Sequence, residues 1–342
     1  MSKIEIEHVT FTYPGADAPT LNDLNLCVEE GDFLAIVGNN GCGKSTFCKT
    51  LNGLIPHFIV GDMTGSIRID GVDTREQEIG DLAKRVGYVY QDFENQIVCP
   101  TVLDDASYGC LNYAMEDYKE RGKNALQICG LSSKISDYVW QLSGGQKHLL
   151  ALAGAAALSP DVLILDEPIA QLDPAHADQI YEILKEWNET YHKTIIVIEH
   201  HTEYIARYCK HVLLLRDGKN VWQLPAQEAM RRVKELRRSN IFPPQVTIAA
   251  DRMAEEGLVP ADESFPVNIE EGKAFFWEIS EASAGKHAHG QNPGRRRISG
   301  FLSECDRTIP GSERAGAQDP GSVFPGHPER GENCADRIQW SG

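Results

Sequence analysis

The sequence predicts an α/β fold built on a mainly parallel sheet that is covered by helices on both faces. Three apolar runs, Val162–Leu165, Thr194–Ile198 and Val212–Leu215, show no alternation with polar residues, and helical stretches lie between them. Such runs are typical of parallel strands buried on both sides. A fourth apolar run, Phe33–Val37, leads into a glycine-rich loop with the spacing of a phosphate-binding loop.

Length, charge and cysteine content limit the classes to consider. The 342 residues can form one large or two modest domains. The net charge of −17 argues against nonspecific nucleic-acid binding, so we expect no nucleic-acid partner. Nine cysteines without a C-x-x-C pair suit a reducing compartment. No secretory segment opens the chain, and no apolar run reaches the roughly 18 residues of a membrane span. We therefore expect any membrane role to be exerted from the cytoplasmic face through a partner.

The N-terminal region is expected to form an antiparallel β subdomain. Apolar and polar residues alternate at Ile4–Val9 and at Leu24–Val28, and Tyr13–Gly15 breaks the pattern between them. The segment Ser66–Asp70 alternates in the same way and runs into Asp70-Gly71, a dipeptide typical of a tight hairpin turn.

Helical patterns fill most of the middle of the chain. A helix is expected over Lys44–Leu54, stopped by Pro56. The texture after Gln91 is helical through about Ala157, which predicts a helical subdomain over about residues 92–158. Another helix is expected from about Ala175 to Tyr191.

The last apolar strand ends in a turn at Asp217-Gly218, and the sequence pattern changes after it. Arginines and lysines gather on a predicted helix at Ala229–Arg238, which either contacts anionic lipid headgroups or is simply solvated. Pro243-Pro244 then marks a boundary. We expect a main domain over residues 1–240 and a small extension, with two short helical patterns, over residues 241–283.

The glycine-rich loop fits the pattern G-x-x-x-x-G-K-[ST], with Gly38, Gly43, Lys44 and Ser45 at its fixed positions. Glycines let backbone N–H groups surround phosphate oxygens, and the following helix adds partial positive charge. Lys44 is expected to reach the β- and γ-phosphates, and the Ser45 hydroxyl to bind Mg²⁺. A chance glycine-rich turn is disfavoured by the strand before it and the helix after it. The predicted nucleotide-binding residues are Gly38, Asn39, Asn40, Gly41, Cys42, Gly43, Lys44, Ser45 and Thr46.

A second motif, Leu142-Ser-Gly-Gly-Gln146, precedes an apolar strand that ends in Asp166-Glu167. A phosphate-binding loop, this motif and such a strand, in that order, resemble the ATP-binding cassette (ABC) ATPases, and the resemblance runs from about residue 3 to residue 240. The Ser143 hydroxyl and the N–H groups of Gly144 and Gly145 lie at a predicted helix start and form a second anion site with Gln146. The resemblance implies ATP as the ligand and two cassettes that meet head to tail, each closing over the ATP of the other.

The resemblance also assigns roles to acidic and amide side chains. Asp166 matches the residue that holds Mg²⁺, and Glu167 matches the general base that polarises the attacking water. Gln91 matches the Q-loop glutamine that senses Mg²⁺ and the membrane partner. With Lys44, these residues make up most of the implied catalytic set.

Three further residues match the family pattern less specifically. His200 matches the switch histidine at the γ-phosphate, with the adjacent His201 as the rival. Asp173 matches the D-loop residue that couples the two sites. Tyr13 is expected to stack on adenine, with a core aromatic as the alternative.

Two departures from the family pattern stand out. Lys147 is followed by His148, whereas the family often has a further cation on this helix, and its loss could weaken contacts between cassettes. The segment Ile169-Ala170 replaces small hydroxyl residues. Neither change removes a catalytic group, so hydrolysis is still expected.

The segments Asp92–Ile97 and Pro100–Asp105 are similar to the Q-loop region of the energy-coupling-factor (ECF) ATPases, which implies uptake of a vitamin, a vitamin precursor or a transition-metal ion. Asn52–His57 and Asp70–Thr74 look like the first half of tandem two-cassette ATPases of thiamine-precursor uptake, and Glu199-His200 fits that branch. The implied partners are an integral membrane T component and a substrate-binding S component. The alternatives are a soluble ABC ATPase outside transport, or a truncated product that binds ATP without efficient hydrolysis.

Residues 284–342 have a different texture, rich in Gly, Arg, Ser and Pro without periodicity. A disordered tail is the direct interpretation. The alternative is a frameshift. Read one nucleotide later with permitted codons, Asn333–Gly342 gives Thr-Ala-Leu-Ile-Gly-Ser-Asn-Gly-Ala-Gly, the start of another phosphate-binding loop. We therefore expect this tail to be either disordered or out of frame.

Overall fold

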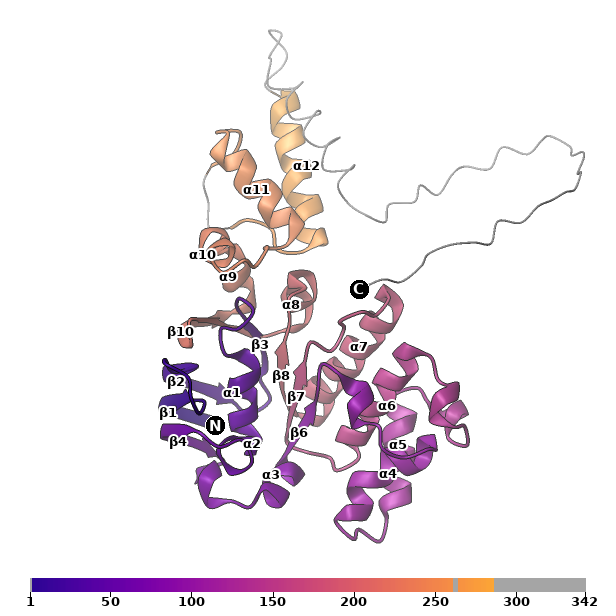
Figure 1. Ribbon diagram of the computed structural model, residues 1–342. Coiled ribbons are helices and arrows are strands. Elements are labelled where there is room, and N and C mark those ends of the chain that lie inside the picture. Colours follow the sequence, from indigo (N-terminus) through magenta and orange to yellow (C-terminus); the bar gives the residue numbers. More distant parts are fainter. Residues whose placement is uncertain (1, 261–263, 286–342) are drawn as a thin grey trace, which may run out of the picture. The chain divides into compact units, whose positions relative to one another are not determined.

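A six-stranded sheet forms the centre of the computed structural model, which describes residues 2–260 and 264–285 (Figure 1). Five neighbouring strands are parallel and the edge strand β10 is antiparallel to β9, which confirms the predicted α/β fold. In sheet order the strands are β10 (Lys219–Pro225), β9 (His211–Arg216), β3 (Phe33–Val37), β8 (Thr194–Ile198), β7 (Val162–Asp166) and β6 (Val86–Val89).

A second, antiparallel sheet confirms the predicted N-terminal β subdomain. Its order is β2 (Leu21–Glu29), β1 (Ser2–Thr12), β4 (Asp62–Ile69) and β5 (Val72–Asp73). The predicted turn between β4 and β5 has positive φ angles at both central residues, 49° at Asp70 and 78° at Gly71. This conformation matches the twist of a two-residue hairpin.

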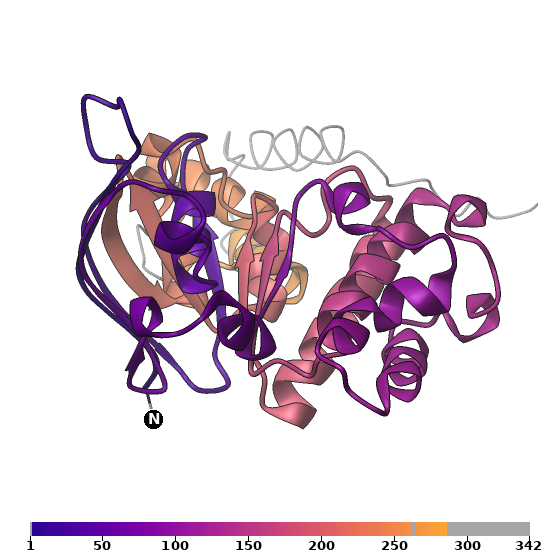
Figure 2. The same ribbon diagram turned by 60° about the horizontal axis from the view of Figure 1, so that its bottom comes forward.

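The central strands lack polar alternation because each of them faces two hydrophobic cores. On β7, Leu163 and Leu165 belong to a core formed with the helices, whereas Val162 and Ile164 belong to a core shared with the antiparallel sheet. Figure 2 shows the antiparallel sheet on one side of the central strands and the helical subdomain on the other. Each fully buried Leu or Ile contributes about 1.5–3 kcal/mol to folding.

The helix after the phosphate-binding loop is shorter than predicted. Helix α1 spans Lys44–Leu51, and Gly53 then adopts a positive φ of 76°. A separate short helix, α2 (Leu54–His57), contains Pro56. The predicted end at Leu54 was therefore wrong, because the break comes from the left-handed glycine rather than from the proline.

Helices dominate residues 92–158 as predicted, in short pieces as well as long ones. This region contains η2 (Phe93–Gln96), α4 (Val102–Asn112), α5 (Tyr118–Ile128), η3 (Ser132–Lys134), η4 (Val139–Gln141) and α6 (Gly144–Ala156). The remaining helices of the main fold are η1 (Thr74–Glu76), α3 (Ile79–Arg85), α7 (Pro174–Tyr191) and α8 (Thr202–Tyr208). Helix α7 confirms the helix that was expected from about Ala175 to Tyr191.

The predicted cationic helix at Ala229–Arg238 is two helices, α9 (Ala226–Arg231) and α10 (Val233–Arg238). Two of its cations have polar partners, one in another part of the chain and one within the segment itself. The Arg231 guanidinium donates to the carbonyl oxygen of Phe265 at 2.8 Å, and Arg232 pairs with Glu228 at 2.7 Å. The two helical patterns of the extension are confirmed as α11 (Gln245–Glu255) and α12 (Ile269–Gly285).

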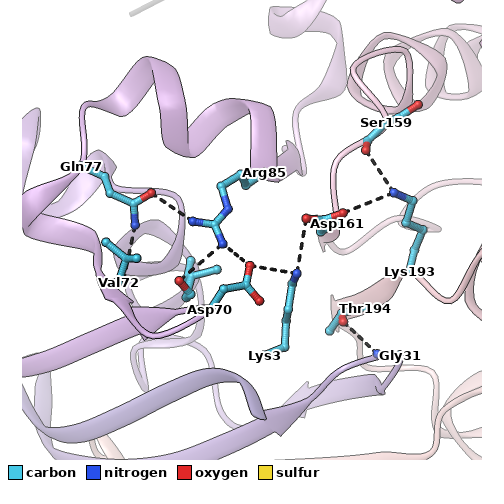
Figure 3. A network of polar contacts seen from close by, with 11 residues as sticks. Lys3, Gly31, Asp70, Val72, Gln77, Arg85, Ser159, Asp161, Lys193 and Thr194 are labelled. Carbon is cyan, nitrogen blue, oxygen red and sulfur yellow. Dashed lines mark hydrogen bonds and ion pairs between the residues drawn. The ribbon is translucent and has the colours of Figure 1, made fainter. Parts of the chain in front are cut away.

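A polar network joins the two sheets at the amino ends of the central strands (Figure 3). The Lys3 ammonium, on β1, lies 3.0 Å from a carboxylate oxygen of Asp70 and 3.3 Å from one of Asp161. Arg85 also pairs with Asp70, and Lys193 pairs with Asp161 at 3.6 Å. The motifs predicted to be catalytic follow the opposite, carboxyl ends of these strands, so this network belongs to the scaffold rather than to the predicted site.

One compact unit, bounded by Met1 and Lys286, contains all the described residues. None of the helices in residues 2–260 and 264–285 has the length and hydropathy that a membrane span requires. Apart from its first two residues, the predicted tail over 284–342 lies outside the described residues.

Candidate functional site

The phosphate-binding loop follows β3 in a conformation that requires glycine at two positions. Gly38 has φ of 156°, and a Cβ there would lie 2.3 Å from the carbonyl oxygen of Leu215. Gly43 has φ of 106°, and a Cβ there would lie 2.9 Å from the carbonyl oxygen of Thr20. A side chain at either position would therefore push the loop away from the neighbouring backbone segment. The loop is held between β9 and the segment that precedes β2.

Lys44 opens α1 with its side chain folded back over this loop. The residue is 7% exposed. Its ammonium donates to the carbonyl oxygens of Gly38 and Asn39, at 2.8 and 3.1 Å. The cation and the first turn of the helix therefore lie at the same loop, an arrangement that favours an anion. Burial raises the pKa of the Cys42 thiol in this loop, so Cys42 adds no negative charge.

Tyr13 lies next to the first turn of α1. Its hydroxyl is 3.1 Å from the Thr46 hydroxyl, and its ring meets the Phe11 ring edge to face at 4.9 Å. The ring is partly buried against the core shared by the two sheets. Tyr13 therefore has core contacts as well as a position beside the loop, and its stacking on adenine stays a prediction.

Three predicted catalytic side chains meet at the carboxyl ends of β6, β7 and β8. The Gln91 amide nitrogen donates to Oε2 of Glu167 at 2.7 Å. The Nε2 atom of His200 lies 3.2 Å from Oε1 of the same carboxylate. These residues are far apart in sequence and come together because β6, β7 and β8 are neighbours in the sheet. The structure thus brings Gln91, Glu167 and His200 into one cluster.

Asp166 lies at the end of β7, immediately before this cluster, and is 7% exposed. The Tyr88 hydroxyl, from β6, donates to its Oδ2 atom at 3.2 Å. Burial and the nearby Asp166 charge raise the pKa of Tyr88, which keeps the hydroxyl protonated as a donor. Sequence reasoning missed Tyr88, because only the pairing of β6 with β7 reveals this contact.

The two candidate switch histidines have different partners. His200 faces Glu167, whereas Nδ1 of His201 lies 2.8 Å from Oε1 of Glu199. Glu199 is 2% exposed at the end of β8. Sequence reasoning assigned this carboxylate no role, although an acid that ends a fully apolar strand, as Asp166 does, is a feature that could have identified it.

Magnesium would find a suitable donor set among the predicted ligands. Ser45 offers a hydroxyl, Gln91 an amide oxygen and Asp166 a carboxylate, and oxygen donors of these kinds suit Mg²⁺. The Gln91 nitrogen is already bonded to Glu167, so its amide oxygen is the atom that can face a cation. The residues therefore fit an ion that is shared with bound phosphates.

The Leu142–Gln146 motif forms the start of α6, as predicted. Ser143 caps the helix, and its hydroxyl accepts the Gln146 N–H at 3.3 Å while the Gln146 side chain accepts the Ser143 N–H at 3.0 Å. A Cβ on Gly144 would meet nothing within 4 Å, whereas one on Gly145 would lie 2.5 Å from the His176 ring. This leaves the first helical turn open on one side and closely packed on the other.

Asp173 caps α7 beside this motif. Its carboxylate accepts the N–H groups of Ala175 and His176 at 3.0 and 3.2 Å. The hydrogen bond from the His176 side chain lowers the pKa of Asp173. Within the described residues, none of the hydrogen bonds of Ser143, Gln146 or Asp173 reaches the phosphate-binding loop. Among the described residues, these hydrogen bonds therefore do not join the two predicted anion sites to each other.

Lys147 and His148, where the sequence departs from the family pattern, connect α6 to the segment after Gln91. The Lys147 ammonium lies 2.8 Å from Oε1 of Glu94. His148, 2% exposed, stacks on Phe93 with ring centroids 4.2 Å apart. Neither ring nitrogen of His148 has a hydrogen-bond partner among the described residues, and burial lowers the pKa of His148 to about 4. His148 thus behaves as a neutral core residue rather than as a surface cation.

A groove of about 440 Å³ opens beside η2, and a smaller pocket of about 160 Å³ shares Val98 with it. Val98 and Trp140 on its wall are 60% and 67% exposed. Asp105 holds the wall in place by accepting the N–H groups of Val98 and Cys99 at 2.8 and 2.9 Å. The groove lining is Glu94, Ile97, Val98, Cys99, Pro100, Val139, Trp140 and Lys147.

Sequence comparisons match this arrangement to one family. Residues 21–170 match the family model described as ABC transporter. An ABC transporter ATP-binding protein of Pyrococcus abyssi is 38% identical over 251 residues, 72% of this chain and 90% of that protein. The energy-coupling factor transporter ATP-binding protein EcfA2 of Caldanaerobacter subterraneus is 34% identical over 79% of this chain and 95% of its own length. An ABC transporter ATP-binding protein of Methanosarcina mazei is 34% identical over 85% of this chain, which spans 51% of that longer protein.

Solved structures give the same result. The cbiO1 protein of Clostridium perfringens, part of the ABC transporter complex cbiONQ, is 29% identical with a TM-score of 0.62, over 73% of this chain and 99% of that one. The ATP-binding cassette MJ0796, a dimer in a post-hydrolysis state with ADP and Pi, is 28% identical with a TM-score of 0.58, over 65% of this chain and 98% of that one.

Proposed function

Since the chain belongs to the ABC transporter ATPases, we propose that it is the ATP-hydrolysing subunit of an importer of the ECF type. The likeness to EcfA2 and cbiO1 supports this branch. The transported solute in this proposal is a vitamin, a vitamin precursor or a transition-metal ion. The subunit acts at the cytoplasmic face of the membrane, bound to an integral T component that works with a substrate-binding S component.

The Glu167 cluster is the observation that carries the enzymatic part of the proposal. In this role Glu167 polarises the attacking water, while Gln91 and His200 hold its two carboxylate oxygens, at 2.7 and 3.2 Å. Lys44 stabilises charge on the β- and γ-phosphates. Mg²⁺, held by Ser45, Gln91 and Asp166, would neutralise charge on the same phosphates.

The separation of the two anion sites supports a paired arrangement. The helix start that carries Ser143, Gly144 and Gly145 is open on one side. Within the described residues, the hydrogen bonds of Ser143 do not reach the phosphate-binding loop. We propose that this motif closes over ATP held by a second cassette, and that Asp173 lies at the contact between the two. A second copy of this chain supplies every element that the partner needs.

The groove beside η2 supports a membrane partner. Most of its lining side chains are apolar, and the ion pair of Glu94 and Lys147 on its wall links it to α6. It also adjoins the segment that follows Gln91. A helix of an integral membrane protein, with apolar residues on one face, fits such a groove. Movement of that helix would be transmitted to both Gln91 and α6. A soluble ABC ATPase outside transport would have no such occupant.

A photocrosslinking amino acid at Trp140, in the groove, tests the transport role. The full chain is added to membranes of its own cell, and crosslinked products are identified by mass spectrometry. We expect a polytopic integral membrane protein, captured from Trp140 but not from the exposed Tyr191, and lost when Val98→Arg adds charge to the groove. Capture of soluble proteins alone, or capture insensitive to Val98→Arg, contradicts the proposal.

A further inference from the structure

Glu199 is a buried carboxylate next to a proposed catalytic residue. It directly follows the apolar strand β8, is 2% exposed and immediately precedes His200. A carboxylate in such a position is costly unless several donors surround it. The hydrogen bonds that Glu199 accepts therefore indicate its structural role.

One oxygen of Glu199 holds the backbone of the loop that carries His200. Its Oε1 atom accepts the N–H of His200 at 2.7 Å and the N–H of His201 at 2.9 Å. The Nδ1 atom of His201 lies 2.8 Å from the same oxygen. Two consecutive peptide groups are thus fixed to a single atom by charge-assisted hydrogen bonds, which are about twice as strong as neutral ones.

The other oxygen of Glu199 is fixed by Tyr181, which is fully buried on α7. The Tyr181 hydroxyl donates to Oε2 at 3.0 Å. Its ring stacks on those of Phe33, Tyr204 and Tyr208, with centroids 6.4, 4.8 and 5.0 Å away, so the hydroxyl has little freedom to move. Burial and the Glu199 charge raise the pKa of Tyr181, which keeps it a donor.

We propose that Glu199 is a positioning residue that, anchored by Tyr181, holds the loop backbone so that His200 faces Glu167. Helix α7, which carries Tyr181, begins at Asp173, so the same contact ties the His200 loop to the helix that we place between cassettes. The inference rests on the proposed role of His200 in ATP hydrolysis. It adds a residue pair that acts on turnover without touching the nucleotide.

The variant Glu199→Gln tests this, because it keeps the size of the side chain and removes the charge that the His200 and His201 N–H groups and the Tyr181 hydroxyl share. We expect kcat for Mg-ATP hydrolysis to fall about tenfold while the Kd for ATP stays within about twofold. Glu203→Gln, an exposed change of the same charge in α8, is the matched control and should leave kcat unchanged. Tyr181→Phe should also lower kcat. This second variant tests the proposal if Glu199→Gln fails to fold.

A double-mutant cycle with His200→Ala separates positioning from general damage. If Glu199 acts through His200, then Glu199→Gln causes no further loss in the His200→Ala background, measured in single-turnover assays. Amide exchange at residues 199–202 should also accelerate in Glu199→Gln and not in Glu203→Gln.

The outcomes distinguish two failures. Wild-type kcat in Glu199→Gln or Tyr181→Phe, or an equal loss in both His200 backgrounds, overturns the positioning role alone. Wild-type kcat in His200→Ala overturns the proposed role of His200 itself, and the positioning role with it.

Discussion

Glu167 adopts a backbone conformation that few residues other than glycine tolerate. Its φ is 52°, and its N–H donates to the carbonyl oxygen of Ile198 at 3.0 Å. Such left-handed geometry costs about 1–3 kcal/mol in residues other than glycine, so the surrounding structure must hold it in place. At the end of β7 it turns the carboxylate toward Gln91 and His200 on the neighbouring strands.

His148 should make stability depend on pH. Its pKa is about 4 in the fold and about 6.5 when unfolded, so the folded state binds fewer protons and stability falls as pH drops from about 6.5 toward 4. Between pH 7 and pH 5 this amounts to about 2 kcal/mol for this residue.

Urea denaturation of the wild type and of His148→Leu at the two pH values measures this contribution. Leucine removes both ring nitrogens, which have no partner among the described residues, and keeps an apolar contact for Phe93. The variant should lose about 2 kcal/mol less than the wild type on going to pH 5. Equal losses in the two proteins would show that His148 is not held neutral in the fold.

Individual site residues could be predicted from sequence where a short spacing fixes their geometry. Gly38, Gly43 and Lys44 lie within one loop, so their pattern alone predicts where the backbone must turn. Tyr88 and Glu199 could not be predicted in this way. Their roles depend on partners from other elements, Asp166 on β7 and Tyr181 on α7, which only the sheet order and helix packing bring near.

At the scale of elements, the strands followed their pattern more closely than the helices did. An apolar run such as Leu163–Leu165 can only be buried, whereas a helix end depends on single residues. Gly53 ends the first helix earlier than Pro56 would, and Arg232 divides one predicted helix into α9 and α10. Helix boundaries of this kind need the local φ angles and not only periodicity.

The network of Figure 3 makes a prediction at this scale. Lys3→Met removes the ammonium that joins β1 to Asp70 and Asp161, and leaves these two carboxylates close together. Because Lys3 is 7% exposed, we expect a loss of about 1–2 kcal/mol in the free energy of unfolding. Urea denaturation measures it.

Lys123→Met is the matched control. Lys123 pairs with Glu120 on the surface of α5 at 3.6 Å, and its loss should cost less than about 0.5 kcal/mol. ATP affinity should be unchanged in both variants, since neither lysine lies near the phosphate-binding loop. A Lys3→Met protein as stable as the wild type would show that the network does not join the sheets energetically.

In our proposal the whole molecule carries two half-sites on one chain, and its activity depends on pairing. Lys44→Ala disables the phosphate-binding loop. Gly144→Asp places negative charge at the other anion site, where a side chain meets nothing within 4 Å and should not disturb the fold. Each variant alone should be inactive.

A mixture of the two variants should regain activity if copies of this chain pair with each other. A mixed pair contains one composite site in which both halves are intact. At equal amounts, half of the pairs are mixed, so activity should reach about one quarter of the wild type. Mixtures as inactive as the separate variants would contradict pairing between copies.

The most direct test of the catalytic site is Mg-ATP hydrolysis by Glu167→Gln, measured together with the Kd for ATP. The side chain keeps its size and loses the ability to accept a proton. We predict wild-type affinity for ATP with at least about a hundredfold fall in kcat, as expected for loss of a general base. Substantial Mg-ATPase activity in this variant would contradict the assignment of Glu167 and with it the proposed mechanism.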